Sequence, residues 1–388
     1  MSTTADEAFL AGMGRVAKLA SVHADEVDRE ARFPHEAVHA LRDEGSLSAL
    51  VPTHLGGADV SLSAVAAGCL ELGTSCSATA MVFAMHTIQV SSLARHLDDA
   101  PWFTNYLARS VQEQRLISSV TSEVQTGGDL GSSAAAVQAA ANCGNRFEKQ
   151  APTVSYGAYA DDLLTTLRRH DAAEPGDQVL VLTSREQTEL EPVGRWDTLG
   201  MRGTCSPGFV VRARMRPEQV LPTPFARVSA ESMVPVSHIL WSHAWLGIAT
   251  DAFARARAFV RAGAQRTGGS PPPSAEQLTR LHGLICLLRA TVANGLGEFC
   301  RATAGEGRAE LSTMAYALRS NALKLTASEL TPQICEGALA ICGISGFRND
   351  TPYSVGRHLR DAMSAQVMVA NSRIRASNAG LLLVVKEA

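Results

Sequence analysis

Apolar residues recur at helical spacing in the first and last parts of the chain, but not in the middle. Near the N-terminus, Leu10, Met13 and Val16 lie on one stripe, and Pro34 suits the first turn of a helix that stops at Gly45. Further helices are expected at about 64–73, 78–96, 244–262, 274–304, 311–341 and 355–383. Glycine and proline residues at 268–273 and glycine residues at 343–347 separate the later helices.

The middle of the chain has a different pattern, in which glycine, serine and threonine become frequent. Short β-branched or apolar runs stand between turn signals at 116–120, 178–183 and 208–213. We therefore expect an α+β protein. Its predicted parts are an N-terminal α-helical domain (1–114), a middle antiparallel β-barrel-like domain (115–226) and a C-terminal four-helix bundle (227–388).

Charge and cysteine usage exclude several classes of protein. The 388 residues include 35 Lys and Arg against 38 Asp and Glu, so no basic footprint for nucleic acid or an anionic membrane is expected. The longest apolar stretches, such as 380–385, are far shorter than the ~20 residues of a membrane helix. The eight cysteines form no C-x-x-C pair. Residues 1–13 lack the basic region followed by a hydrophobic run that is typical of a secretory signal. These features favour a cytoplasmic protein with reduced thiols.

One short motif raises the question of a metal. Residues 35–39 (HEAVH) match H-E-x-x-H, which can bind zinc when it lies on a helix. Here Ala37, Val38 and Leu41 form the apolar face of the predicted helix, and both histidines point to the opposite side. We interpret the motif as a solvated helix face and expect no metal site.

Several motifs along the chain are informative through their order. They are residues 52–57 (PTHLGG), 122–129 (SEVQTGGD), 153–161 (TVSYGAYAD), 196–204 (WDTLGMRGT), 343–347 (GISGF) and 357–362 (RHLRDA). They resemble motifs of the acyl-CoA dehydrogenase family: P-x-x-x-G-G, T-E-P-x-x-G-S-D, W-I-T-N-A-x-x-A-D, W-x-x-x-G-M-R-x-T, and the pair G-G-x-G-Y and R-x-x-R-D-A. The resemblance spans nearly the whole chain and agrees with the predicted order of helices, β domain and helices.

The resemblance implies a flavin, FAD or alternatively FMN, held between the middle domain and the C-terminal helices. By position, Ser122 and Ser155 would supply hydrogen bonds that tune the flavin ring, and Ser119 and Thr121 would lie along the same strand. Thr153 stands where the family often has an aromatic residue against the ring.

Glycines would complete the cofactor site that the resemblance implies. Gly127 and Gly128 would let the backbone approach the cofactor or substrate closely. Gly343 begins a loop that in family members helps to bind the adenine half of FAD, contributed to a neighbouring subunit. Ala340 and Ile344 depart from the family pattern there, which suggests weaker FAD retention, a different geometry or a flavin that comes and goes. The family also implies a homodimer or homotetramer built on the C-terminal helices.

A dehydrogenase of this family needs a carboxylate base for the α-proton of its substrate. The two positions from which the family draws that Glu are Val369 and a position near Ser237 here, so both lack a carboxylate. His238, next to the second position, is a candidate base at neutral pH. The backbone N–H of Val369 remains able to bind a thioester carbonyl oxygen.

Three functional hypotheses follow from the resemblance. The first is α,β-dehydrogenation of an acyl thioester, carried by CoA or a carrier protein, with an external electron acceptor. The second is a monooxygenase on the same fold, supplied by a flavin reductase, with His86 and Ser155 as candidate residues. The third is a non-catalytic relative that keeps the fold as a binding or assembly partner.

Overall fold

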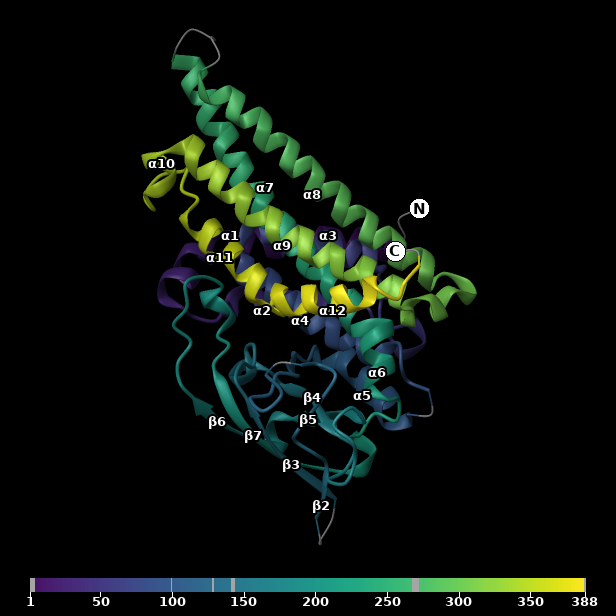
Figure 1. The fold of residues 1–388 in the computed structure, drawn as a ribbon. Coiled ribbons are helices and arrows are strands. Elements are labelled where there is room, and N and C mark those ends of the chain that lie inside the picture. Colours follow the sequence, from purple (N-terminus) through teal and green to yellow (C-terminus); the bar gives the residue numbers. More distant parts are fainter. Residues whose placement is uncertain (1–3, 99, 128, 141–143, 267–271, 387–388) are drawn as a thin grey trace.

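The computed structural model describes residues 4–98, 100–127, 129–140, 144–266 and 272–386. It has a helical half above and a β half below (Figure 1). Helices from both ends of the chain share one hydrophobic core. Two of them, α3 (Leu62–Ser75) and α7 (Val234–Arg266), cross very closely. A Cβ atom on Gly247 would lie 2.4 Å from the carbonyl oxygen of Leu70, so this crossing requires glycine.

The N-terminal helices follow the predicted periodicity. Besides α3 they are α1 (Thr4–Glu30), α2 (His35–Asp43), α4 (Ser77–Ala94) and α5 (Pro101–Glu113). Within the HEAVH segment on α2, Glu36 accepts an ion-paired hydrogen bond from Arg32 Nη1 at 2.9 Å, and His35 packs edge-on against Tyr159. These two side chains therefore have structural partners.

The β half consists of two packed sheets. Its strands are β1 (Ile117–Val120), β2 (Gln138–Ala139), β3 (Asn145–Ala151), β4 (Asp162–Arg168), β5 (Gln178–Ser184), β6 (Thr188–Val193) and β7 (Gly208–Met215). The strand orders are β1-β4-β5 and β2-β3-β7-β6. Side chains such as Phe147, Leu163, Val181 and Phe209 form the core of this half.

The β half differs in two details from the expected antiparallel β-barrel-like domain. The described strands form two separate sheets and no closed barrel, and β1 pairs in parallel with β4, with Ile117 opposite Asp162. Short apolar runs indicate that a segment is a strand, but they carry no information about the direction of its partner.

The C-terminal helices form the predicted bundle with two differences. The helices are α6 (Phe225–Val228), a π-helical turn (Ser229–Met233), α7, α8 (Ser274–Thr303), α9 (Met314–Cys342), α10 (Ile344–Phe347), α11 (Gly356–Val367) and α12 (Asn371–Leu382). The α7 helix begins ten residues before the predicted 244, and the predicted helix over 355–383 is interrupted between α11 and α12. Val369, at this interruption, has a left-handed φ of 44°.

Among the described helices, α8 is the one whose length and hydropathy would also suit a membrane span. In this fold it packs along α7 and α9 as a bundle helix (Figure 1). Its outer face includes Leu287, which is 52% exposed. Self-association through the C-terminal helices stays a prediction.

Candidate active site

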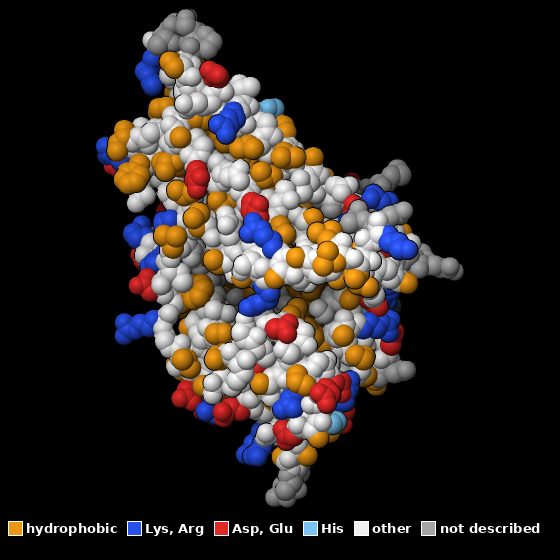
Figure 2. All heavy atoms as spheres, in the orientation of Figure 1, with side chains coloured by type: hydrophobic (Ala, Val, Ile, Leu, Met, Phe, Trp, Pro, Cys, Tyr) orange, Lys and Arg blue, Asp and Glu red, His pale blue; other side chains and the backbone are white. Residues whose placement is uncertain are grey.

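A cavity of about 1070 Å³ lies where the β half meets the helices of both chain ends. Figure 2 shows the hollow between the two halves, below α11 and α12, with apolar side chains along it. The lining includes Met81, Met85, Ile88 and Gln89 on α4; Ser119, Thr121, Ser122, Thr153 and Ser155 around β1; Trp196, Thr198, Met201, Thr204 and Ser206 before β7; and Ser237, His238, Trp241, Asn321, Arg360, Met363, Met368, Val369 and Arg373 on the C-terminal helices. The volume is slightly above the ~300–1,000 Å³ typical of small-molecule sites.

Most of the candidate site residues identified from the sequence line this cavity. Those that line it are Ser119, Thr121, Ser122, Thr153, Ser155, His238 and Val369. His86, Gly127 and Gly343 are not in the lining, and Gly128 lies outside the described residues. Gly343 instead caps α9, where its φ of 55° suits glycine.

Two hydrogen bonds connect the two segments that carry the serine and threonine residues of the cavity. Ser122 Oγ donates to the carbonyl oxygen of Thr153 at 2.7 Å, and Ser118 Oγ donates to that of Ser155 at 2.8 Å. These bonds join the end of β1 to the segment that follows β3. Ser122, Thr153 and Ser155 are thereby kept side by side at the cavity.

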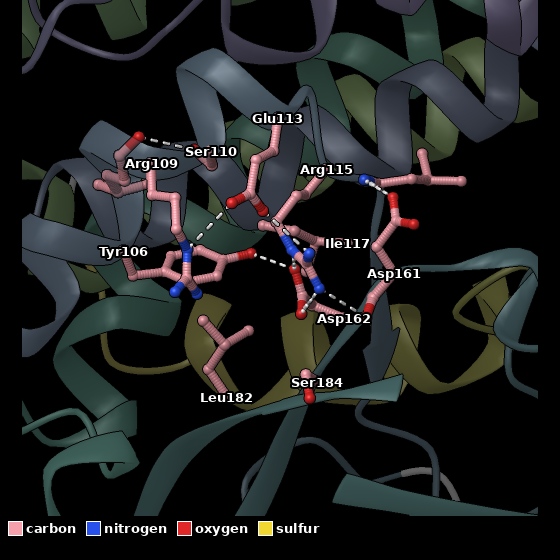
Figure 3. A network of polar contacts seen from close by, with 12 residues as sticks. Tyr106, Arg109, Ser110, Glu113, Arg115, Ile117, Asp161, Asp162, Leu182 and Ser184 are labelled. Atoms are coloured by element: carbon pink, nitrogen blue, oxygen red, sulfur yellow. Dashed lines mark hydrogen bonds and ion pairs between the residues drawn. The ribbon is translucent and has the colours of Figure 1, made fainter. Parts of the chain in front are cut away.

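A buried polar network fixes the start of β1 (Figure 3). Tyr106 Oη donates to Asp162 Oδ2 at 2.6 Å, and Arg115 reaches both carboxylate oxygens of Asp162 at 2.6 and 2.8 Å. Such charge-assisted bonds replace the hydration that the buried carboxylate loses. Because Arg115 precedes β1 and Asp162 begins β4, the network sets how β1 enters the sheet and delivers Ser119 to the cavity.

His86 also positions β1 and lies in the core. Its Nδ1 accepts from the backbone N–H of Ile117 at 3.0 Å, so its Nε2 donates to the carbonyl oxygen of Leu47 at 2.7 Å. Burial lowers the pKa of His86 to about 4, which keeps the ring neutral. Both ring nitrogens are therefore occupied by backbone groups.

His238 has one ring nitrogen left for chemistry. Its Nδ1 lies 3.0 Å from the carbonyl oxygen of Ser320, which can only accept, so Nδ1 carries the proton. Nε2 is then the acceptor, and it has no partner among the described residues. Burial lowers the pKa of His238 to about 4, so the ring is neutral near pH 7. The cavity thus contains a neutral imidazole acceptor.

Carboxylates are scarce around the cavity. Among the described lining residues, Asp129 alone carries one, and its exposed side chain accepts hydrogen bonds from the Gly131 N–H at 2.9 Å and the Ser132 hydroxyl at 3.0 Å. Val369 and Ser237 occupy the positions at which the family resemblance places a base. No buried carboxylate from the described residues therefore faces the cavity.

The turn between α11 and α12 is held in a strained conformation. Lys324, which is fully buried, donates from Nζ to the carbonyl oxygen of Val369 at 3.1 Å and to Asn371 Oδ1 at 2.5 Å. A left-handed β-branched residue costs roughly 1–3 kcal/mol and persists when its surroundings enforce it. The Lys324 contacts enforce it here and keep Val369 at the cavity.

The loop at 196–204 is fastened to α11 by a buried carboxylate. Asp361 Oδ1 accepts from the backbone N–H of Met201 at 2.6 Å, and its Oδ2 accepts from the Ser77 hydroxyl. A Cβ atom on Gly200 would lie 2.1 Å from the carbonyl oxygen of Arg360, so the loop can approach α11 only with glycine there. This contact brings the 196–204 loop to the cavity.

A second buried carboxylate supports the segment after β1. Glu123 accepts from the Ser133 hydroxyl at 2.8 Å and from the Ala135 N–H at 2.7 Å, and Lys149 Nζ lies 3.5 Å away. Glu123 is adjacent to Ser122 but does not line the cavity. Its role is to position the chain that carries Ser122.

Sequence reasoning missed the apolar wall of the cavity. Six of the ten methionines line it, namely Met81, Met85, Met201, Met233, Met363 and Met368, together with Trp241. The α4 helix is buried almost all round, so its pattern has no polar stripe from which a cavity-facing side could be told. The spacing of Met81 and Met85 by four residues was the available signal.

Comparisons with known proteins agree with this architecture. Residues 6–100 match the family described as acyl-CoA dehydrogenase, N-terminal domain. The amino sugar nitrososynthase DnmZ from Streptomyces peucetius is 24% identical over an alignment of 355 residues that covers 88% of this chain and 84% of that protein.

Two solved structures have the same fold over almost their full length. KijD3 in complex with FMN and dTDP-3-amino-2,3,6-trideoxy-4-keto-3-methyl-D-glucose superposes with a TM-score of 0.85 at 20% identity, covering 100% of this chain and 96% of that one. TdsC from Paenibacillus sp. A11-2, in complex with FMN and indole, gives 0.81 at 18% identity over 97% and 96%. The chain therefore has an acyl-CoA dehydrogenase-like fold, and residues 6–100 are similar to the N-terminal domain of that family.

Proposed function

We propose that this chain is a reduced-flavin-dependent monooxygenase that oxidises a nucleophilic atom, foremost an amine nitrogen. The observation that carries the proposal is the composition of the cavity, which offers a neutral imidazole but no buried carboxylate from the described residues. A dehydrogenase of the kind that the chain resembles removes the α-proton of a thioester with a carboxylate, whereas transfer of oxygen to an amine nitrogen requires no carboxylate. DnmZ is an amino sugar nitrososynthase, and KijD3 and TdsC have been crystallised with FMN, which supports the same reading.

The residues present fit a flavin. Ser122, Thr153 and Ser155 form a hydroxyl-bearing wall at the end of β1, and the volume of about 1070 Å³ accommodates an FMN-sized molecule with a small substrate. We propose that these three residues hold the ring system. A bound reduced flavin supplies two electrons, so that one atom of O₂ passes to the substrate and the other leaves as water.

The protein side chains would orient the substrate and exclude water. We propose that His238 Nε2 accepts the proton from the substrate N–H, because Nδ1 is committed to Ser320 and the ring is neutral. Met81, Met85 and Trp241 form apolar walls around it. Apolar walls of this kind keep bulk water away from the reacting atoms.

One experiment, with an anaerobic stage followed by exposure to air, distinguishes the proposed oxygenation from thioester dehydrogenation. With FMN-loaded protein, octanoyl-CoA is expected to leave the oxidised flavin absorbance unchanged, since no buried carboxylate is available to take the α-proton. After chemical reduction, exposure to air is expected to reoxidise the bound flavin and, with the probe 2-naphthylamine present, to give an oxygenated amine. Bleaching of the oxidised flavin by octanoyl-CoA without oxygen would contradict the proposal.

A His238→Gln variant tests the proposed role of His238 in the same experiment. Loss of a positioned base typically lowers a rate by about 10²- to 10⁴-fold. We expect slower formation of the oxygenated amine by at least about 10²-fold, with unchanged FMN affinity. An unchanged rate would remove His238 from the mechanism and leave the oxygenase proposal in place.

A further inference from the structure

A second, smaller cavity adjoins the one just described. This cavity, called the annex here, has a volume of about 350 Å³ and lies between the 130–131 and 176–178 segments of the β half and the starts of α7 and α9. Leu130, Val234 and Asn321 line both cavities. Ser320, whose carbonyl oxygen holds His238, also lines the annex. The two spaces therefore meet at the candidate base.

The annex is uncharged. None of the described residues that line it is Asp, Glu, Lys, Arg or His. The neighbouring cations are already paired: Arg227 Nε lies 3.0 Å from Glu231, and Arg319 Nε lies 3.2 Å from Glu298. A phosphate in the annex would accordingly lose its hydration without gaining a cationic partner.

Two further features able to attract an anion are also occupied. The α9 N-terminus borders the annex, but the hydroxyl of Thr313 caps it by accepting from the Tyr316 N–H at 3.2 Å. The arginines of the main cavity lie on α11 and α12 and do not line the annex. Arg360 donates to both carboxylate oxygens of Asp28, and Arg373 donates to the carbonyl oxygen of Gly127.

The lining of the annex combines uncharged polar side chains with aromatic and aliphatic ones. Phe225 and Tyr316 are 1% and 4% exposed, and Leu311 is 2% exposed. Ala230 and Ala317 contribute only methyl groups to the lining. Surfaces of this kind favour a flat, uncharged group, which gains about 25 cal/mol for each Å² of apolar area that it buries.

We propose, on the basis of the proposed function, that the annex binds the uncharged aromatic body of the substrate while its amine lies at His238. The substrate class is then a neutral aryl or aryl-bearing amine rather than a sugar linked to a nucleoside diphosphate. This chain would differ in that respect from KijD3, which has been crystallised with a dTDP-linked sugar.

Equilibrium binding to FMN-loaded protein tests the assignment with two probes, 2-naphthylamine and dTDP. We expect the wild type to bind 2-naphthylamine with little dependence on salt, and dTDP neither to bind nor to displace it. An Ala317→Phe variant fills the annex and is expected to weaken 2-naphthylamine binding by at least about 10-fold. Ala315→Phe is the control, because Ala315 is also half-buried on α9 but lines neither cavity.

Three results would overturn the assignment: failure of the wild type to bind 2-naphthylamine, equal binding by the Ala317→Phe variant, or salt-sensitive binding of dTDP. Each is independent of turnover. FMN content is measured in the same samples, so loss of the flavin or absence of oxygenation would count against the proposed function and not against the annex.

Discussion

An Asp361→Ala variant is expected to lose about 3–5 kcal/mol of unfolding free energy and, with it, the shape of the flavin cavity. Asp361 is 3% exposed and accepts from the Met201 N–H and the Ser77 hydroxyl. Its removal leaves both donors without a partner in the core, and it leaves the nearby guanidinium of Arg357 with Asp25 as its remaining carboxylate neighbour. Urea unfolding and FMN titration of the same variant measure the two consequences.

The conservative variant and a surface control make this result specific. Asp361→Asn keeps one acceptor oxygen and is expected to lose less stability than the alanine variant. Asp350, which pairs with Arg348 on the surface, is the control, and Asp350→Ala is expected to change stability by less than about 1 kcal/mol. Equal stability of Asp361→Ala and Asp350→Ala would show that Asp361 does not hold the 196–204 loop.

Acidification from pH 7.5 to pH 5 is expected to destabilise the fold by several kcal/mol. His86, His96 and His238 are buried, and burial lowers the pKa of each to about 4. In the unfolded chain each imidazole titrates near 6.5, so between pH 6.5 and 4 the unfolded state binds protons that the native state does not. Stability is therefore full above pH 6.5 and falls as the pH drops, by roughly 2 kcal/mol for each imidazole at pH 5.

Urea unfolding at a series of pH values measures this slope. A His86→Gln variant removes one of the three groups and is expected to flatten the pH dependence, whereas His39→Gln, at an exposed position, is expected to leave it unchanged. The carboxylate of Asp251, whose pKa is lowered to about 2 chiefly by its hydrogen bond from His358 against the effect of burial, acts only at lower pH. Equal stability at pH 7.5 and pH 5 would mean that these imidazoles are not buried as described.

The helices at both ends of the chain could be predicted because an amphipathic pattern with a period of about 3.6 residues shows which side of a helix is buried. Fully buried segments lack this contrast between an apolar side and a polar side. The α4 helix was expected from its apolar content, but the side that lines the cavity was not. The β3 strand was missed because charged residues hide its alternation; Lys149 in its middle is buried and bonded to Thr166. The break at Val369 depends on Lys324, 45 residues away in the chain, and no local pattern encodes such a contact.

The motifs indicated which segments lie at the cavity, but they did not indicate how its side chains are hydrogen-bonded. The hydroxyls of Ser122 and Ser155 reach the cavity because their segments are joined by local hydrogen bonds. His86 and His238 could not be distinguished by sequence, since each lies in an apolar helix. Their roles differ because backbone groups occupy both nitrogens of His86 but only Nδ1 of His238.

Titration of the purified chain with FMN, followed by flavin fluorescence, tests most directly whether the cavity is a flavin site. Ser155→Trp places an indole in the cavity, and Ser372→Trp, at an exposed position of α12 outside the lining, is its control. We predict one FMN bound per chain for the wild type and the Ser372→Trp variant, and none for a folded Ser155→Trp variant. No binding by the wild type, or undiminished binding by Ser155→Trp, would contradict the placement of a flavin between the β half and the C-terminal helices.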